Sequence, residues 1–126
     1  MNRFTNLEPR YVWHYFDALL DIPRPSKHEE KVIAFLKELA QKKGLEFRQD
    51  KVKNVVLRVP ATKGYENAPT VILQGHIDMV AEKNSDVNFD FLKQPIDAYV
   101  DGEWVKARGT TLGADNGIGV AAALAF

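Results

Sequence analysis

The residues best suited to chemistry lie in two short clusters, and the first contains a histidine and an aspartate. This segment reads Gln74-Gly75-His76-Ile77-Asp78-Met79-Val80 and directly follows the apolar run Thr70–Leu73. Ligands of open α/β sheets collect at the carboxyl ends of strands. In an extended chain, His76 and Asp78 lie on the same side because side chains alternate. An imidazole can bind zinc while a carboxylate orients it from behind, although a structural hydrogen-bonded pair would explain the same residues.

The second cluster places one aspartate in a glycine-rich turn. It reads Gly109-Thr110-Thr111-Leu112-Gly113-Ala114-Asp115-Asn116-Gly117. A carboxylate at Asp115 could bridge two cations, since the glycines allow the backbone to approach closely. The alternative is that Asp115 or Asn116 caps the following helix, which is a common role for both residue types.

The end of this turn also fits a dinucleotide-binding pattern, G-x-G-x-x-A, over residues 117–122. That pattern needs a preceding apolar strand, which Thr110–Asp115 does not provide. The acidic residue expected about 20 positions later would fall beyond Phe126. We therefore disfavour nucleotide binding. Structural or solvated roles are also favoured over metal ligation for His14 and His28.

Two amphipathic helices are expected before these clusters. The first follows Asn6, a candidate cap, and ends before Pro23 and Pro25; its apolar residues at helical spacing are Val12, Trp13, Phe16, Leu19 and Leu20. Ser26–Glu29 has the form of a capping box, with serine at the cap and glutamate three residues later. The second helix starts there, and Gly44 provides its C-terminal stop.

Strands and one last helix are expected in the rest of the chain. Leu45–Gln49, Asn54–Val59 and Thr70–Leu73 have strand-like sequences, the last one covered on both faces. Asp101-Gly102 between Ile96–Val100 and Glu103–Ala107 predicts a hairpin. The apolar stretch Ile118–Phe126 predicts a buried helix. The fold class is therefore α/β, a mixed sheet with flanking helices. The last helix lacks a cap and a polar face, so we expect a piece of a longer protein.

Composition excludes several classes of function. The 126 residues suit one domain or part of one. Lys+Arg and Asp+Glu both number 17, so no net charge attracts nucleic acid. There is no cysteine, which excludes disulfides, thiolate zinc sites and cysteine nucleophiles. No apolar run approaches the roughly 20 residues that span a membrane. With no signal peptide visible, a cytoplasmic location is expected.

Three segments in a fixed order carry a family resemblance. They are Ile22–Glu29, the glycine–His76-x-Asp78-x-Val80 segment, and Gly109–Gly117. With them the sequence resembles, over nearly its whole length, the N-terminal region of aminoacyl-histidine dipeptidases, also called Xaa-His or cytosol non-specific dipeptidases. These enzymes belong to the M20 clan of zinc peptidases. The resemblance implies that residues 1–126 are the N-terminal part of a catalytic metallopeptidase domain, without the lid or dimerisation domain.

The resemblance also implies roles for single residues. His76 would ligate one metal, Asp115 would bridge two metals, and Asp78 would orient the site as a catalytic residue. The peptide bond after Asp115 would be cis, as is typical of the family. A Glu-Glu pair, a further acidic ligand and a distant histidine would follow beyond Phe126. Ala81 departs from many relatives, which have proline after the valine.

The activity implied is hydrolysis of dipeptides of the Xaa-His type, by a water that two zinc ions or other divalent metals activate. The partners expected are a small dipeptide and further copies of the chain, with no nucleic acid and no membrane. These 126 residues alone are predicted to be inactive and to bind zinc weakly. The competing hypothesis is a non-catalytic α/β binding domain.

Overall fold

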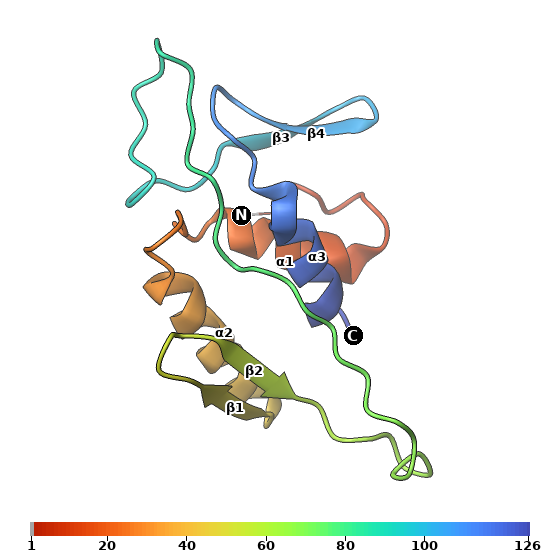
Figure 1. Ribbon diagram of the computed structural model, residues 1–126. Helices are drawn as coiled ribbons and strands as arrows, with labels where there is room; N and C mark the ends of the chain where they lie inside the picture. The colour runs from red at the N-terminus through yellow and green to blue at the C-terminus, as the bar shows by residue number, and fades with distance from the viewer. Residues whose placement is uncertain (1) are drawn as a thin grey trace. The chain divides into compact units, whose positions relative to one another are not determined.

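The computed structural model describes residues 2–126, which form three helices and four short strands. In chain order they are α1 (Arg10–Leu20), α2 (Glu30–Lys43), β1 (Glu46–Gln49), β2 (Val55–Arg58), β3 (Ala98–Asp101), β4 (Trp104–Ala107) and α3 (Ala114–Leu124), as Figure 1 shows. The chain divides into two compact units. One holds Ile33–Ile72, and the other holds the chain up to Val32 together with Leu73–Phe126.

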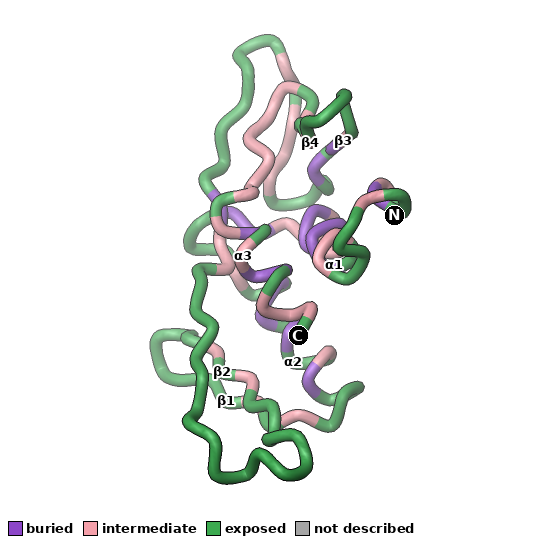
Figure 2. The backbone as a smooth tube through the Cα atoms, turned by 90° about the vertical axis from the view of Figure 1, so that its right-hand side faces the viewer, coloured by how far each residue is buried: buried purple, intermediate pink, exposed green. Residues whose placement is uncertain are grey.

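Helix α1 supplies much of the core of the larger unit. Its buried residues are Tyr15, Phe16, Asp17, Leu19 and Leu20, and it packs against α3 (Figure 2). Each fully buried Phe or Leu side chain contributes about 1.5–3 kcal/mol. The helix expected here is confirmed, but its predicted cap is wrong. Pro9 occupies the N-cap, and the carboxylate of Glu8, rather than Asn6, accepts the backbone N–H of Arg10 over 2.8 Å.

Helix α3 begins earlier than expected and is buried on one side only. Its buried residues are Gly117, Val120 and Ala121, whereas Ile118 is 36% exposed and Phe126 is fully exposed. The prediction that this stretch is buried all round is therefore wrong. The physical reason is that α1, its main packing partner among the described elements, covers a single face.

Two antiparallel hairpins account for the strands. β1 pairs with β2, with Phe47 opposite Leu57, and β3 pairs with β4, with Val100 opposite Val105. The second turn is the predicted Asp101-Gly102 turn, and Gly102 has φ +60°, where glycine is favoured. The hairpin predicted at Asp101-Gly102 is thus confirmed, and the two strands expected within Leu45–Gln49 and Asn54–Val59 are found, paired in a second hairpin that was not predicted.

The strand predicted at Thr70–Leu73 is wrong. The segment crosses the surface without strand pairing among the described residues, and Val71 and Ile72 are 79% and 83% exposed (Figure 2). A strand needs neighbouring backbone to satisfy its N–H and C=O groups, and among the described residues this segment makes no such backbone hydrogen bond. The mixture of helices and strands confirms the α/β class. Parallel pairing in the described part of the chain is limited to one bridge, between Pro25 and Met79.

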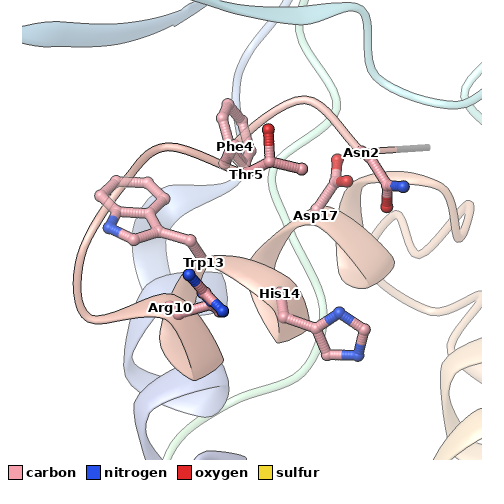
Figure 3. Close-up of a pocket in the computed structure, with 7 residues that line it drawn as sticks. All are labelled: Asn2, Phe4, Thr5, Arg10, Trp13, His14 and Asp17. Carbon is pink, nitrogen blue, oxygen red and sulfur yellow. The ribbon is translucent and has the colours of Figure 1, made fainter.

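A hollow of about 380 Å³ lies on the N-terminal segment and α1. Its lining residues are Asn2, Phe4, Thr5, Arg10, Trp13, His14 and Asp17 (Figure 3). Figure 3 shows Arg10, Trp13 and His14 projecting from α1. None of the predicted site residues lines this hollow. Among the described residues, no helix combines the length and apolar character needed to cross a bilayer.

Candidate functional site

The structure brings the two predicted clusters together around one imidazole. Nδ1 of His76 lies 3.0 Å from Oδ1 of Asp78, and Nε2 of His76 lies 2.9 Å from Oδ1 of Asp115. Asp78 follows two residues after His76 in the same loop, whereas Asp115 comes from the start of α3. Two motifs that are 39 residues apart in sequence therefore form one site.

The two carboxylates differ in exposure. The side chain of Asp78 is 30% exposed and that of Asp115 is 97% exposed, with His76 between them at 52%. Asp115 therefore has lone pairs directed to solvent. The hydrogen bond between His76 and Asp115 is the main reason that the pKa of His76 is raised; Asp78 adds to this effect and slight burial opposes it.

On the inner side of the site, Asp78 is held by Ser26. The Ser26 hydroxyl donates to Oδ2 of Asp78 over 2.5 Å, and this bond is the main cause that lowers the pKa of Asp78. The capping box predicted at Ser26–Glu29 is therefore wrong. Helix α2 begins at Glu30, and the Glu29 carboxylate accepts from the backbone N–H of Lys27 instead. No local pattern could reveal that Ser26 faces a segment about fifty residues away.

The backbone around Ser26 pairs with the His76–Asp78 loop. The N–H of Met79 donates to the carbonyl of Arg24 over 3.0 Å, and the N–H of Ser26 donates to the carbonyl of Met79 over 3.1 Å. This pairing forms the parallel bridge between Pro25 and Met79. These two hydrogen bonds hold the loop that carries His76 at Met79, against the segment Arg24–Ser26.

Sequence reasoning missed Arg24, which is 1% exposed. Its Nη1 donates to the carbonyls of Ile77 and Asp78 over 3.1 and 3.2 Å, and its Nη2 donates to the carbonyl of Gly113 over 2.8 Å. Burial lowers the pKa of Arg24 to about 10, against an opposing effect of Asp78, so the group stays charged at neutral pH. The only sequence signal was its place in the Ile22–Glu29 segment.

Two glycines make room for this guanidinium. A Cβ at Gly113, which has φ +76°, would lie 2.8 Å from Nη2 of Arg24, and a Cβ at Gly117 would lie 2.6 Å from it. Both distances are shorter than side chains tolerate. The glycines of the second cluster thus serve the packing of Arg24 as well as the turn.

Asp115 and Asn116 do not cap α3. The N-cap position is Gly113, with no side-chain cap bond, and Asp115 and Asn116 have non-helical backbone angles inside the first turn. The alternative of a capping role is therefore wrong. The peptide bond between Asp115 and Asn116 is cis, as predicted. The dinucleotide-like pattern lies within α3, and no strand leads into it.

The donor set fits a divalent metal but is small. An imidazole nitrogen and a carboxylate oxygen are donors that zinc accepts. Within the described part of the chain, no group of three or more His, Cys, Asp or Glu side chains could hold a metal ion. His76 and Asp115 thus supply part of a coordination sphere.

The chain is similar to known peptidases in both structure and sequence. No family model matches this chain. A crystal structure of a peptidase, aminoacylhistidine dipeptidase from Vibrio alginolyticus, matches with a TM-score of 0.94 and 50% sequence identity. The match covers 97% of this chain and 25% of that chain.

A curated relative gives the same result. The chain is 51% identical over 125 residues to cytosol non-specific dipeptidase from Escherichia coli (strain K12), covering 99% of this chain and 26% of the relative. The resemblance to aminoacyl-histidine dipeptidases is therefore confirmed. The chain spans about a quarter of the length of the relatives that it matches.

Proposed function

We propose that the protein containing this chain is a metal-dependent dipeptidase whose substrates are dipeptides of the Xaa-His type. The observation that carries the proposal is the contact of 2.9 Å between His76 Nε2 and Asp115 Oδ1, with Asp78 behind the imidazole. It occurs in a chain 51% identical to a cytosol non-specific dipeptidase. In this proposal residues 1–126 are the first part of the catalytic domain.

Each of the three residues has a distinct task. Asp78 accepts Nδ1–H of His76, so that Nε2 would carry a lone pair for a metal once it gives up the proton of its hydrogen bond to Asp115. Nε2 and the exposed Asp115 carboxylate then offer lone pairs to the same place, and Asp115 has a second oxygen for a second metal. Two zinc ions, or other divalent metals, would supply a water of lowered pKa and polarise the peptide carbonyl when bound.

The same ligand set implies that the 126 residues alone are inactive. A catalytic zinc normally has three protein ligands and a water. Here one metal would have His76 and Asp115, and the other would have Asp115 alone. The remaining ligands and a general base would come from a part of the longer protein that corresponds to the portion of the relatives not matched by this chain. Calorimetric titration of the 126-residue chain should therefore show no sub-micromolar zinc binding.

We also propose a cytoplasmic homo-oligomer, without nucleic-acid or membrane partners. The relative from Escherichia coli is named as a cytosol protein. Ile118 and Phe126 leave apolar surface on and after α3, and exposed apolar patches favour association. Light scattering across a range of concentrations tests this proposal, and a monomer throughout the range would contradict it.

The central experiment uses the longer protein. Hydrolysis of Xaa-His dipeptides should stop after chelation and return with Zn²⁺. Asp115→Asn should lower kcat/KM by at least about a hundredfold, since one carboxylate serves both metals. Asp86→Asn, in an exposed loop, is the matched control and should leave the rate unchanged.

Two results would overturn this proposal. One is a rate that survives prolonged chelation, and the other is a near-normal rate for Asp115→Asn. A folded longer protein that hydrolyses no dipeptide would favour the non-catalytic binding domain.

A further inference from the structure

We propose that Arg24 is the positioning residue of this site: its guanidinium sets the separation between the His76–Asp78 loop and the turn that carries Asp115. Metal affinity and turnover would then depend on a residue that touches neither metal nor substrate. The inference deepens the proposed function and rests on it for the identity of the metal site.

The geometry places Arg24 at the junction of both motifs. Nη1 bonds the carbonyls of Ile77 and Asp78, and Nη2 bonds the carbonyl of Gly113. The first two carbonyls directly follow His76 in the chain, and the carbonyl of Gly113 lies two residues before Asp115. A guanidinium is planar and its donors have fixed directions, so one side chain fixes two chain segments relative to each other.

The surroundings prevent the guanidinium from shifting. At the backbone of Arg24, the carbonyl accepts a hydrogen bond from the N–H of Met79. On the other side, Gly113 and Gly117 approach so closely that even a methyl group would overlap Nη2. The guanidinium is thus closely packed where it makes its three hydrogen bonds, which is what a spacer between two loops requires.

Stability alone does not explain a buried arginine here. In the described part of the chain, the Arg24 side chain bonds only carbonyl oxygens, and its buried Nε has no hydrogen-bond partner. Buried charges are costly, and well-packed apolar side chains of similar volume often serve stability equally well or better. What an apolar side chain cannot do is hold carbonyls of two distant segments at a set distance.

Arg24→Lys in the longer protein tests this inference. A lysine keeps the charge but lacks the planar pair of donors, so the two loops lose their common anchor. We expect zinc affinity, measured by calorimetry, and kcat each to fall about 10- to 100-fold, with KM changing much less. The ¹⁵N resonances of the His76 ring, recorded at one fixed pH on the metal-free protein, should also shift.

A second variant leaves Arg24 itself unchanged. Gly117→Ala puts a methyl group 2.6 Å from Nη2, at a position in α3 where alanine suits the helix better than glycine. It should displace the guanidinium and reproduce the same losses. Arg108→Lys is the matched control, because Arg108 is exposed and contacts Asp97 and Tyr99 away from the site. It should change none of the three measurements.

The outcomes separate this inference from the proposed function. A folded Arg24→Lys protein with unchanged zinc affinity and unchanged His76 resonances overturns the positioning role. If Arg24→Lys does not fold, the same measurements on Gly117→Ala decide. If the unmodified longer protein hydrolyses no dipeptide, the proposed function fails, yet the His76 resonances still test whether Arg24 positions the loop.

Discussion

Two arginines lie inside the larger unit, and their surroundings are opposite. The side chain of Arg3 is 9% exposed and meets the carboxylates of Asp17 and Asp21. Arg24 is 1% exposed and meets backbone carbonyls. Burial by itself would lower the pKa of either guanidinium. For Arg3 the hydrogen bonds to Asp21 and Asp17 outweigh burial and raise the pKa, whereas the pKa of Arg24 falls to about 10.

The difference separates two uses of a buried cation. Arg3 neutralises charge and attaches the N-terminal segment to α1, a task that apolar packing can also perform. Arg24 stays without a carboxylate of its own and connects loops that carry the candidate site. Disturbing the Arg3 arrangement should therefore change the free energy of unfolding. Disturbing the Arg24 arrangement should change zinc affinity and kcat.

The largest effect on stability is expected for Asp17→Asn. Asp17 is 5% exposed, and its carboxylate accepts from both the guanidinium and the backbone N–H of Arg3. Removing one partner of a buried pair costs about 3–5 kcal/mol, and the lower end applies because Asp21 remains. Denaturant unfolding measures the loss, and a loss below about 1 kcal/mol would show that Asp21 alone suffices.

A smaller loss is expected for Gly113→Ala, which disturbs the packing around Arg24. The left-handed φ of +76° costs an alanine about 1–2 kcal/mol. The new methyl group would also meet Nη2 of Arg24 at 2.8 Å and the sulfur of Met79 at 2.9 Å. Gly44→Ala is the control, because Gly44 has φ +66° and nothing within 4 Å. Equal losses for the two variants would show that the packing around Arg24 is loose.

Replacing the whole Arg3 pair should cost less than removing half of it. In the double variant Arg3→Met and Asp17→Leu, both buried charges disappear and apolar groups fill the space. We expect the free energy of unfolding to lie within about 1 kcal/mol of that of the unchanged protein. The remaining loss would come from the contact with Asp21 and from the backbone N–H of residue 3, which bonds Asp17 in the unchanged protein. A double variant as unstable as Asp17→Asn would contradict the view that this pair is replaceable.

The smallest effect concerns an exposed pair, Lys106 and Asp101, at 2.6 Å beside the turn of the β3–β4 hairpin. Its hydrogen bond is the main cause that lowers the pKa of Asp101. Because the folded pKa lies below the ordinary value, any stabilisation is present above that value and disappears as pH falls through the folded pKa. Lys106→Met should raise the Asp101 pKa in an NMR titration without a measurable change in unfolding at neutral pH.

Prediction from sequence succeeded where the determining contacts are local. The β3–β4 hairpin follows from Asp101-Gly102 and its neighbours, and α1 follows from its apolar spacing. His76, Asp78 and Asp115 were found by residue type and family resemblance, and they do meet. Ser26 was misassigned as a cap because a serine followed by a glutamate satisfies the local rule, while its real partner lies 52 residues away.

The remaining errors have the same physical origin. Thr70–Leu73 has the composition of a buried strand, but strand formation depends on a neighbour that the local sequence does not specify. Beyond its place in the Ile22–Glu29 segment Arg24 gave no signal, because nothing in a sequence distinguishes a buried arginine from an exposed one. Both depend on contacts between segments far apart in the chain.

The three bonds of Arg24 also bear on the order in which the protein is made. Gly113 follows Arg24 by 89 residues, and Ile77 follows it by 53. At about 5–20 residues per second, a ribosome takes roughly 4–18 s to add those 89 residues. During that interval the guanidinium has no native acceptor at Gly113 and stays hydrated. The N-terminal third of the chain therefore emerges from the ribosome while Arg24, a deeply buried cation of the folded chain, is still in water. A chaperone that holds this segment unfolded would delay the assembly of the site without preventing the hairpins from forming.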